Sequence, residues 1–159
     1  MAEFGIFAVD VAQGQVALSP IPGRSGSYEN DLSTVLHWGP DMVLTMTTGA
    51  ELDRMGAAGF GDDLSAAGVT WLHLPVEDFG APRPPVRALW ADVSGHAAEV
   101  LARGGKILVH CFGGCGRSGM VALRLMVEAG EPADQALARL RAVRPCAVER
   151  DAQFDWAAG

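Results

Sequence analysis

The chain has 159 residues, 49% of them hydrophobic, which suffices for one domain with a substantial core and is too short for two. Its formal net charge of −7 argues against nonspecific binding to nucleic acids. No apolar run approaches the roughly 20 residues of a membrane span, and residues 1–4 lack the basic start of a secretion signal. Three cysteines do not make a disulfide framework, so we expect one domain, residues 1–159, in the cytoplasm.

Strand-like and helical segments alternate along the chain, which predicts an α/β fold. Short apolar runs bounded by turn residues predict strands at residues 4–9, 15–18, 42–46, 70–74 and 106–109. Apolar residues at helical spacing predict helices at residues 27–37, 50–56, 61–67, 84–102, 120–129 and 132–143. We therefore expect a central, mostly parallel sheet flanked by helices.

One stretch combines the end of a strand, a glycine-rich turn and the start of a helix: His110-Cys111-Phe112-Gly113-Gly114-Cys115-Gly116-Arg117-Ser118. Backbone N–H groups in such a turn point toward an anion, so this loop is expected to bind an oxyanion. Its glycines permit positive φ and remove Cβ atoms that would block the close approach of a ligand.

Two side chains of this loop suit covalent phosphate chemistry. Cys111 lies at its mouth, where the helix dipole, the N–H groups and Arg117 favour a thiolate, the nucleophilic form of cysteine. Arg117 offers a planar fork that grips two oxygens of a tetrahedral phosphate, a geometry that lysine lacks. The alternative is a buried cysteine in an ordinary strand-to-helix turn, which requires the cysteine, the arginine and the glycines to coincide by chance.

The spacing of His110-Cys111, five further residues and then Arg117-Ser118 resembles the signature of the cysteine-dependent protein tyrosine and dual-specificity phosphatases. A second element, Asp-Phe-Gly-Ala-Pro at residues 78–82, resembles the Asp-x-Gly-x-Pro loop that carries the general acid in that family. Partial matches at residues 19–23, at Arg144-Pro145 and at Gln153 extend the likeness over most of the chain. The compact group that includes the cyclin-dependent-kinase-associated phosphatase is the most similar.

The resemblance implies roles for residues beyond Cys111 and Arg117. It implies Asp78 as the acid that protonates the leaving oxygen, with adjacent Glu77 as competitor and a solvated loop aspartate as the alternative. It implies that the Ser118 hydroxyl donates to the cysteine sulfur, against the alternative of a first-turn serine that satisfies a backbone group. It further implies that His110 orders the loop and that Gln153 positions water for the second step.

The other two cysteines carry different expectations. Cys115 lies inside the loop, four residues from Cys111, and can trap an oxidised nucleophile as a disulfide. The alternative is a small side chain that merely fits under the loop. Cys146 receives no role.

Basic residues are unevenly spread. Residues 101–150 carry eight Lys and Arg against four Asp and Glu, so the part of the chain that carries the loop is net positive. A solvated helix face explains most of these arginines, and only Arg117 has a motif behind it.

Together these features predict a metal-independent phosphomonoester hydrolase that needs no cofactor and forms a cysteinyl-phosphate intermediate. Residues 112–116 contain none of the lysines seen in the phosphoinositide-phosphatase branch, which favours a phosphorylated protein substrate. The short chain leaves little room for the extra loop that deepens a phosphotyrosine-only pocket, so dual specificity toward phosphotyrosine and phosphoserine or phosphothreonine is expected. We expect no nucleic-acid or membrane partner, and the sequence does not specify the oligomeric state.

The alternatives are other kinds of phosphate-handling or sulfur-handling protein. A pseudophosphatase binds phosphorylated partners without turnover, but all the catalytic residue types are present here; a phosphoinositide phosphatase would act on lipid. A rhodanese-like sulfurtransferase has a loop typically one residue shorter and no need of Asp78. A low-molecular-weight phosphatase or arsenate reductase has its cysteine loop near the N-terminus, whereas here it lies in the last third.

Overall fold

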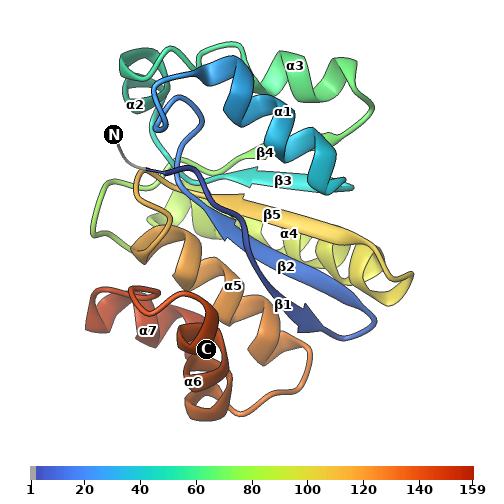
Figure 1. The fold of residues 1–159 in the computed structure, drawn as a ribbon. Helices are drawn as coiled ribbons and strands as arrows, with labels where there is room; N and C mark the ends of the chain where they lie inside the picture. Colours follow the sequence, from blue (N-terminus) through green and yellow to red (C-terminus); the bar gives the residue numbers. More distant parts are fainter. Residues whose placement is uncertain (1–2) are drawn as a thin grey trace.

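The computed structural model of this protein describes residues 3–159. Residues 1 and 2, which belong to the expected domain and to the segment expected to lack a secretion signal, lie outside the described residues. Five strands form one sheet in the order β1–β2–β5–β3–β4 (Figure 1). Their bounds are β1 Phe7–Val11, β2 Gly14–Ser19, β3 Met42–Thr45, β4 Thr70–His73 and β5 Lys106–His110.

The sheet is mostly parallel, as predicted. β1 pairs with β2 antiparallel through the short turn at Ala12 and Gln13, where Ala12 takes a φ of 51°. The β2–β5, β5–β3 and β3–β4 pairs are all parallel. The antiparallel pair is therefore confined to one edge of the sheet.

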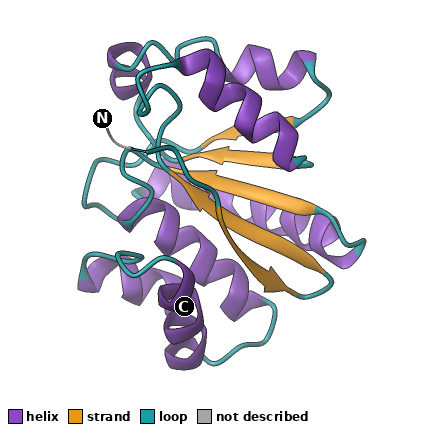
Figure 2. Cartoon of the chain, in the orientation of Figure 1, coloured by secondary structure: helices purple, strands orange, loops and turns teal. Residues whose placement is uncertain are grey.

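Helices cover both faces of the sheet (Figure 2). Their bounds are α1 Tyr28–Trp38, α2 Gly49–Arg54, α3 Phe60–Ala66, α4 Pro84–Ala102, α5 Gly116–Glu128, α6 Ala133–Val143 and α7 Asp151–Ala158. Successive strand side chains point to opposite faces, so Ile107 and Val109 of β5 join the core under α4 to α7. Leu108 joins the core under α1 and α3. The chain is thus a three-layer α/β domain.

The loops that leave the parallel strands gather at one edge of the sheet, where α/β proteins place their ligands. Met46, just beyond β3, donates its N–H to His110 O at 3.0 Å, and Val76, beyond β4, donates to Met46 O at 3.1 Å. Ile21, beyond β2, donates to Phe112 O at 3.0 Å. These bonds bring residues 20–26, 46–48, 74–83 and 111–115 together.

Two helices differ from the sequence-based prediction. α5 begins at Gly116 rather than at residue 120, which places Arg117 and Ser118 in its first turn. α7 was not predicted, because it is short and buries only Gln153 and Ala157. None of the helices within residues 3–159 combines the length and the apolar character needed to cross a bilayer.

Candidate active site

The loop from Cys111 to Cys115 joins β5 to α5 and has its carbonyl groups bonded on the outer side. Phe112 O accepts from Arg24 Nη1 at 3.1 Å, while Gly113 O and Gly114 O accept from the Arg144 guanidinium at 2.8 and 3.1 Å. Gly114 has a φ of 77°, and a Cβ there would lie 2.7 Å from Pro20 N, so this position needs glycine. The N–H groups of residues 112–116 have no acceptor within residues 3–159 and remain available to a ligand.

Cys111 is a free thiol, 3% exposed, at the start of this loop. Its Sγ lies 3.2 Å from Ser118 Oγ, in the first turn of α5. Cys111 lines a cavity of about 190 Å³ together with Phe112 and Arg24 and with Asp78 and Phe79. The predicted nucleophile therefore lies at a cavity and within hydrogen-bond distance of its predicted hydroxyl partner.

Arg117 is 1% exposed and is held from three directions. Its Nη1 and Nη2 donate to the two carboxylate oxygens of Glu51 in α2, at 2.7 and 2.8 Å. Nη1 also donates to Val76 O at 2.9 Å, and Nη2 lies 3.3 Å from Asp78 Oδ1. Its buried Nε has no acceptor within residues 3–159. The guanidinium is thus fixed by both terminal nitrogens and keeps one donor for a ligand.

The Arg117–Glu51 pair is charged on both sides. Burial alone would lower the pKa of Arg117, but hydrogen bonds to Glu51 and the negative charges of Cys111, Glu51 and Asp78 raise it instead. Burial would raise the pKa of Glu51, and hydrogen bonds from Arg117 and Thr48 overcome this and lower it. A full positive charge therefore faces the sulfur of Cys111.

His110 is completely buried beneath the loop, and this burial lowers its pKa to about 4. The ring is therefore neutral at pH 7, with one N–H donor and one acceptor. Trp71 Nε1 donates to Thr45 Oγ1 at 2.7 Å, which leaves the Thr45 hydroxyl proton for His110 Nε2 at 2.8 Å. Nδ1–H then donates to Cys111 O at 3.2 Å. This chain of bonds satisfies every group and connects β4 to the nucleophile's backbone.

Asp78 and Glu77 are adjacent but face different cavities. Asp78 lies beside the Cys111 cavity together with Phe79, whose φ of 62° turns the chain sharply at this point. The Oδ1 atom of Asp78 accepts a hydrogen bond from Phe79 N at 3.0 Å. Glu77 instead borders a neighbouring cavity with Thr48. The geometry favours Asp78 over Glu77 as the acid.

Gln153 is buried where α7 meets both loops. Its Oε1 accepts from Glu149 N and Arg150 N at 2.9 and 3.2 Å, and its Nε2 donates to Gly80 O at 3.1 Å. The amide thus connects α7 to the loop that carries Asp78. A Cβ on Gly116 would lie 3.0 Å from Gln153 Nε2, so the amide also lies against the cysteine loop. Its use in positioning water stays a prediction.

Cys115 forms a disulfide with Cys146, so both interpretations of Cys115, as a trap for oxidised Cys111 and as a small side chain that merely fits under the loop, are wrong. The expectation that Cys115 traps oxidised Cys111 fails because its sulfur is already bonded to Cys146. Cys146, which was given no role, anchors the segment after α6 to the loop. Val148 N donates to Cys115 O at 3.2 Å, and this contact brings the two cysteines together. Sequence separation alone, 31 residues, gave no sign of the pairing.

Sequence reasoning also missed two supporting residues, Glu51 and Thr45, and it gave Arg144 only as part of a partial family match, with no contact to the loop. Only Glu51 had a visible signal, because Thr48-x-x-Glu51 is a capping box at the start of α2. That signal predicts a helix start and says nothing of Arg117. Thr45 comes from a strand that carries no motif for its bond to His110.

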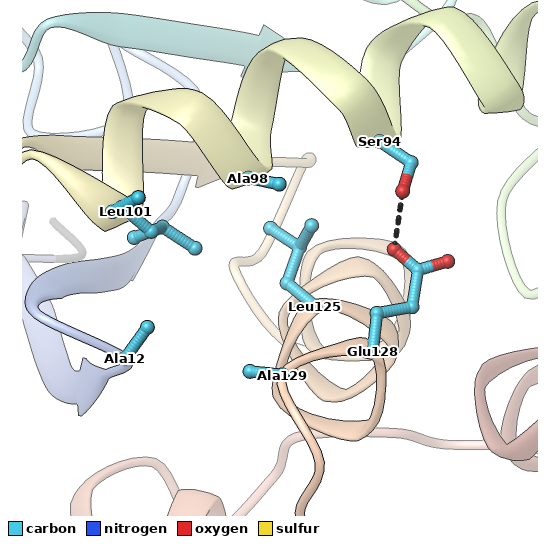
Figure 3. A pocket seen from close by; sticks show the side chains of 8 residues that line it. Ala12, Ser94, Ala98, Leu101, Leu125, Glu128 and Ala129 are labelled. Carbon is cyan, nitrogen blue, oxygen red and sulfur yellow. Dashed lines mark hydrogen bonds between the residues drawn. The ribbon is translucent and has the colours of Figure 1, made fainter.

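A further cavity of about 190 Å³ lies away from the loop, between α4, α5 and Ala12 (Figure 3). Its single marked bond runs from Ser94 Oγ to Glu128 Oε1 at 2.7 Å. The remaining lining is small and apolar: Ala98, Leu101, Ala102, Leu125 and Ala129. Its lining includes neither a cysteine nor an arginine, in contrast to the cavity at Cys111, which both Cys111 and Arg24 line.

Comparison with known proteins agrees with this geometry. Residues 21–131 match the family model described as "Polymorphic toxin system, DSP-PTPase phosphatase" (Tc-R-P). The Mus musculus protein named cyclin-dependent kinase inhibitor 3 is 29% identical over 119 residues, covering 74% of this chain and 55% of its own length. The Rattus norvegicus protein of the same name is 29% identical over 120 residues, with the same coverage. The chain spans about half the length of these curated relatives.

Solved structures share the fold over nearly the whole chain. Kinase associated phosphatase with its catalytic-site cysteine replaced by serine has a TM-score of 0.83 at 21% identity, covering 99% of this chain and 93% of that one. The active form of Tk-PTP has a TM-score of 0.69 at 32% identity, covering 94% and 92%. PTPMT1 in complex with PI(5)P has a TM-score of 0.73 at 20% identity, covering 96% and 92%. The family match over residues 21–131, a range that includes the cysteine loop, shows that this protein belongs to the dual-specificity phosphatase family.

Proposed function

We propose that the protein hydrolyses phosphomonoesters through a cysteinyl-phosphate intermediate and that its substrates are phosphorylated proteins. One observation carries the proposal: the free thiol of Cys111 begins a loop whose N–H groups at residues 112–116, like the buried Nε of Arg117, have no acceptor within residues 3–159. A phosphate dianion supplies acceptors for all these donors at once. Phe112, Gly113, Gly114, Cys115, Gly116 and Arg117 are the residues proposed to bind it.

In the first step, the Cys111 thiolate attacks phosphorus and the bond to the leaving oxygen breaks. Asp78 gives its proton to that oxygen, so a neutral alcohol or phenol departs. A bound phosphate takes the place of Asp78 beside Arg117. Because Asp78 lines the same cavity as Cys111, its carboxyl group is then free to face the leaving oxygen of the substrate. His110 orders the loop through its bond to Cys111 O.

In the second step, water attacks the cysteinyl-phosphate and gives a proton to the Asp78 carboxylate. The S–P bond breaks, and inorganic phosphate and the Cys111 thiolate are released. Ser118 Oγ, 3.2 Å from the sulfur, donates to the returning negative charge. Gln153 is the residue proposed to position this water.

The substrate class is proposed from the loop itself. Residues 112–116 supply no positive side chain, so the loop interior binds one phosphate and offers nothing for the further phosphates of an inositol headgroup. PTPMT1 was solved with PI(5)P, which makes a phosphoinositide the second candidate. We further propose that residues 1–159 form one catalytic domain that needs no metal. The expected cytoplasmic location loses its cysteine argument, because Cys115 and Cys146 form a disulfide.

The test is hydrolysis of p-nitrophenyl phosphate in the presence of a chelator, followed by phosphotyrosine and phosphothreonine peptides and phosphoinositide micelles. We expect turnover of the aryl phosphate and of both peptides. Cys111→Ser should fold and lose at least ~10³-fold in kcat, because a serine hydroxyl offers no comparable anion. A variant that kept a tenth of the rate would rule out the covalent route, and lipid turnover above peptide turnover would change the substrate class.

A further inference from the structure

Phe79, the residue that follows Asp78, combines an unusual backbone with an exposed ring. Its φ of 62° lies in the left-handed region, which a bulky side chain seldom adopts and which costs free energy. The ring is 49% exposed, so burial alone does not hold the residue in this conformation. Such a backbone persists only where the surrounding contacts stabilise it. The contacts of Phe79 and of its neighbour Gly80 therefore decide where this part of the loop lies.

Two residues at the start of α7 supply these contacts. The guanidinium carbon of Arg150 lies 4.7 Å from the centre of the Phe79 ring, which is the distance of a cation–π contact. The buried amide of Gln153 donates to Gly80 O at 3.1 Å and accepts from Arg150 N at 3.2 Å. The start of α7 thus holds both residues that follow Asp78 in the chain.

Phe79 in turn holds the carboxyl group of Asp78. Its N–H donates to Asp78 Oδ1 at 3.0 Å, which leaves Oδ2 as the oxygen that can carry the proton for the leaving group. Oδ1 also lies 3.3 Å from Arg117 Nη2, but this contact is the one that a bound phosphate replaces. No other group within residues 3–159 bonds to this carboxyl. With phosphate in the loop, the position of the acid therefore depends on Phe79.

The side chain of Arg150 is exposed and makes no ion pair with any carboxylate of residues 3–159. A second arginine offers a comparison, because Arg124 of α5 lies 4.8 Å from the ring of Trp156, near the other end of α7. Arg124 also donates to Trp156 O and thus holds the helix. The two stacked arginines separate the holding of α7 from the holding of the loop that carries Asp78.

We propose that Arg150 is a positioning residue of the reaction: by stacking on Phe79 it keeps the Asp78 carboxyl group facing the leaving oxygen. This inference rests on the proposed function, because it takes Asp78 as the acid. It acts on proton transfer and leaves the binding of phosphate, which belongs to the cysteine loop and Arg117, unchanged.

The experiment compares kcat/KM, which reports the first chemical step, for two substrates. A phosphothreonine peptide has a basic leaving oxygen that needs the acid, whereas the phenolate of p-nitrophenyl phosphate leaves unaided. Arg150→Gln should lower kcat/KM for the peptide by about two- to fivefold, as expected for the loss of an exposed cation–π contact. The value for p-nitrophenyl phosphate and the inhibition constant of inorganic phosphate should stay the same. Arg150→Lys, which keeps a cation over the ring, should recover part of the loss.

Arg124→Gln is the matched control. It removes the other arginine that stacks on α7 and should leave the ratio between the two substrates at the wild-type value. Arg150→Gln combined with Phe79→Leu should lower the ratio no further than Phe79→Leu alone, because Arg150 acts through that ring. An unchanged ratio in Arg150→Gln, an equal loss for both substrates, or losses that add fully in the double variant would each overturn the assignment.

The two proposals fail differently. If p-nitrophenyl phosphate is not turned over, the proposed function is wrong and the role of Arg150 falls with it. If Asp78→Asn keeps the wild-type ratio between the substrates, Asp78 is not the acid and Arg150 has nothing to position. If Asp78→Asn lowers the ratio and Arg150→Gln does not, the function stands and only this inference is lost.

Discussion

The Glu51 carboxylate accepts hydrogen bonds from both terminal nitrogens of Arg117, at 2.7 and 2.8 Å. The two residues lie 66 positions apart in the sequence and belong to different helices. The carboxylate lies on α2, whose start is fixed by a capping box in which Thr48 and Glu51 bond each other. The same carboxylate thus caps its own helix and orients the buried arginine. Because both Nη groups of Arg117 are occupied, its Nε is the donor that is left for a ligand.

The first prediction is that Glu51→Gln weakens phosphate binding and the fold together. The amide has one acceptor in place of two and no charge, so a buried guanidinium loses its main counter-charge. We expect a loss of about 2 kcal/mol in the free energy of unfolding and a decline of roughly 10–100-fold in kcat/KM. Urea unfolding and steady-state kinetics measure the two effects. Glu99→Gln, on the exposed side of α4, is the control, and equal behaviour of the two variants would contradict the role of Glu51.

The second prediction separates Asp78 from Glu77 by leaving group. An acid matters more as the leaving oxygen becomes more basic, so Asp78→Asn should slow an alkyl or tyrosyl phosphate by about 10²–10⁴-fold and an activated aryl phosphate far less. Glu77→Gln, which borders a different cavity, should show no such contrast. If Glu77→Gln shows the leaving-group dependence instead, the acid is misassigned by one residue.

The third prediction concerns the disulfide between Cys115 and Cys146. Closing a loop with a sequence separation of 31 restricts the unfolded chain, so Cys146→Ser should lower the free energy of unfolding by about 3 kcal/mol. A dithiol reductant should lower the wild type to the same value and leave the variant unchanged. Urea unfolding with and without reductant measures this. Reductant sensitivity that persists in Cys146→Ser would place the effect at Cys111.

Local signals predicted most of the fold. α4 matches its predicted bounds, because Pro84-Pro85 and Gly104-Gly105 mark its ends. The strand–loop–helix arrangement at Cys111 likewise follows from a short apolar run and a glycine-rich turn.

Long-range partners could not be predicted from local signals. Glu51, Arg144 and Cys146 reach the loop only after the parallel strands bring their segments to one edge of the sheet. A single glutamate, arginine or cysteine in the sequence does not indicate which distant residue it will contact. Helix α7 was not predicted for a related reason. It buries only Gln153 and Ala157, and two buried side chains are too few to give a periodic apolar pattern in the sequence.

The last prediction concerns His110 and the dependence of stability on pH. In the unfolded chain a histidine has a pKa near ~6.5, whereas burial lowers the pKa of His110 to about 4 in the folded protein. Between these values the unfolded state binds more protons, so stability is complete above pH 6.5 and falls as the pH is lowered. The slope approaches ~1.4 kcal/mol per pH unit, which gives a loss of about 3 kcal/mol by pH 4.

His110→Gln isolates this effect, because its amide keeps a donor and an acceptor near Thr45 and Cys111 and does not titrate. The variant is expected to be less stable than the wild type at pH 7, and the gap should narrow as the pH falls from 6.5 to 4.5. Glu51 does not interfere, because its lowered pKa confines its own contribution to lower pH, where its carboxylate becomes protonated. His96→Gln, on the exposed side of α4, should run parallel to the wild type. Unfolding free energies from urea titrations at half-unit pH steps measure the three curves. Parallel stability curves for wild type and His110→Gln would mean that His110 is protonated in the folded state. The assignment of a neutral ring, which accepts from Thr45 and donates to Cys111 O, would then be wrong.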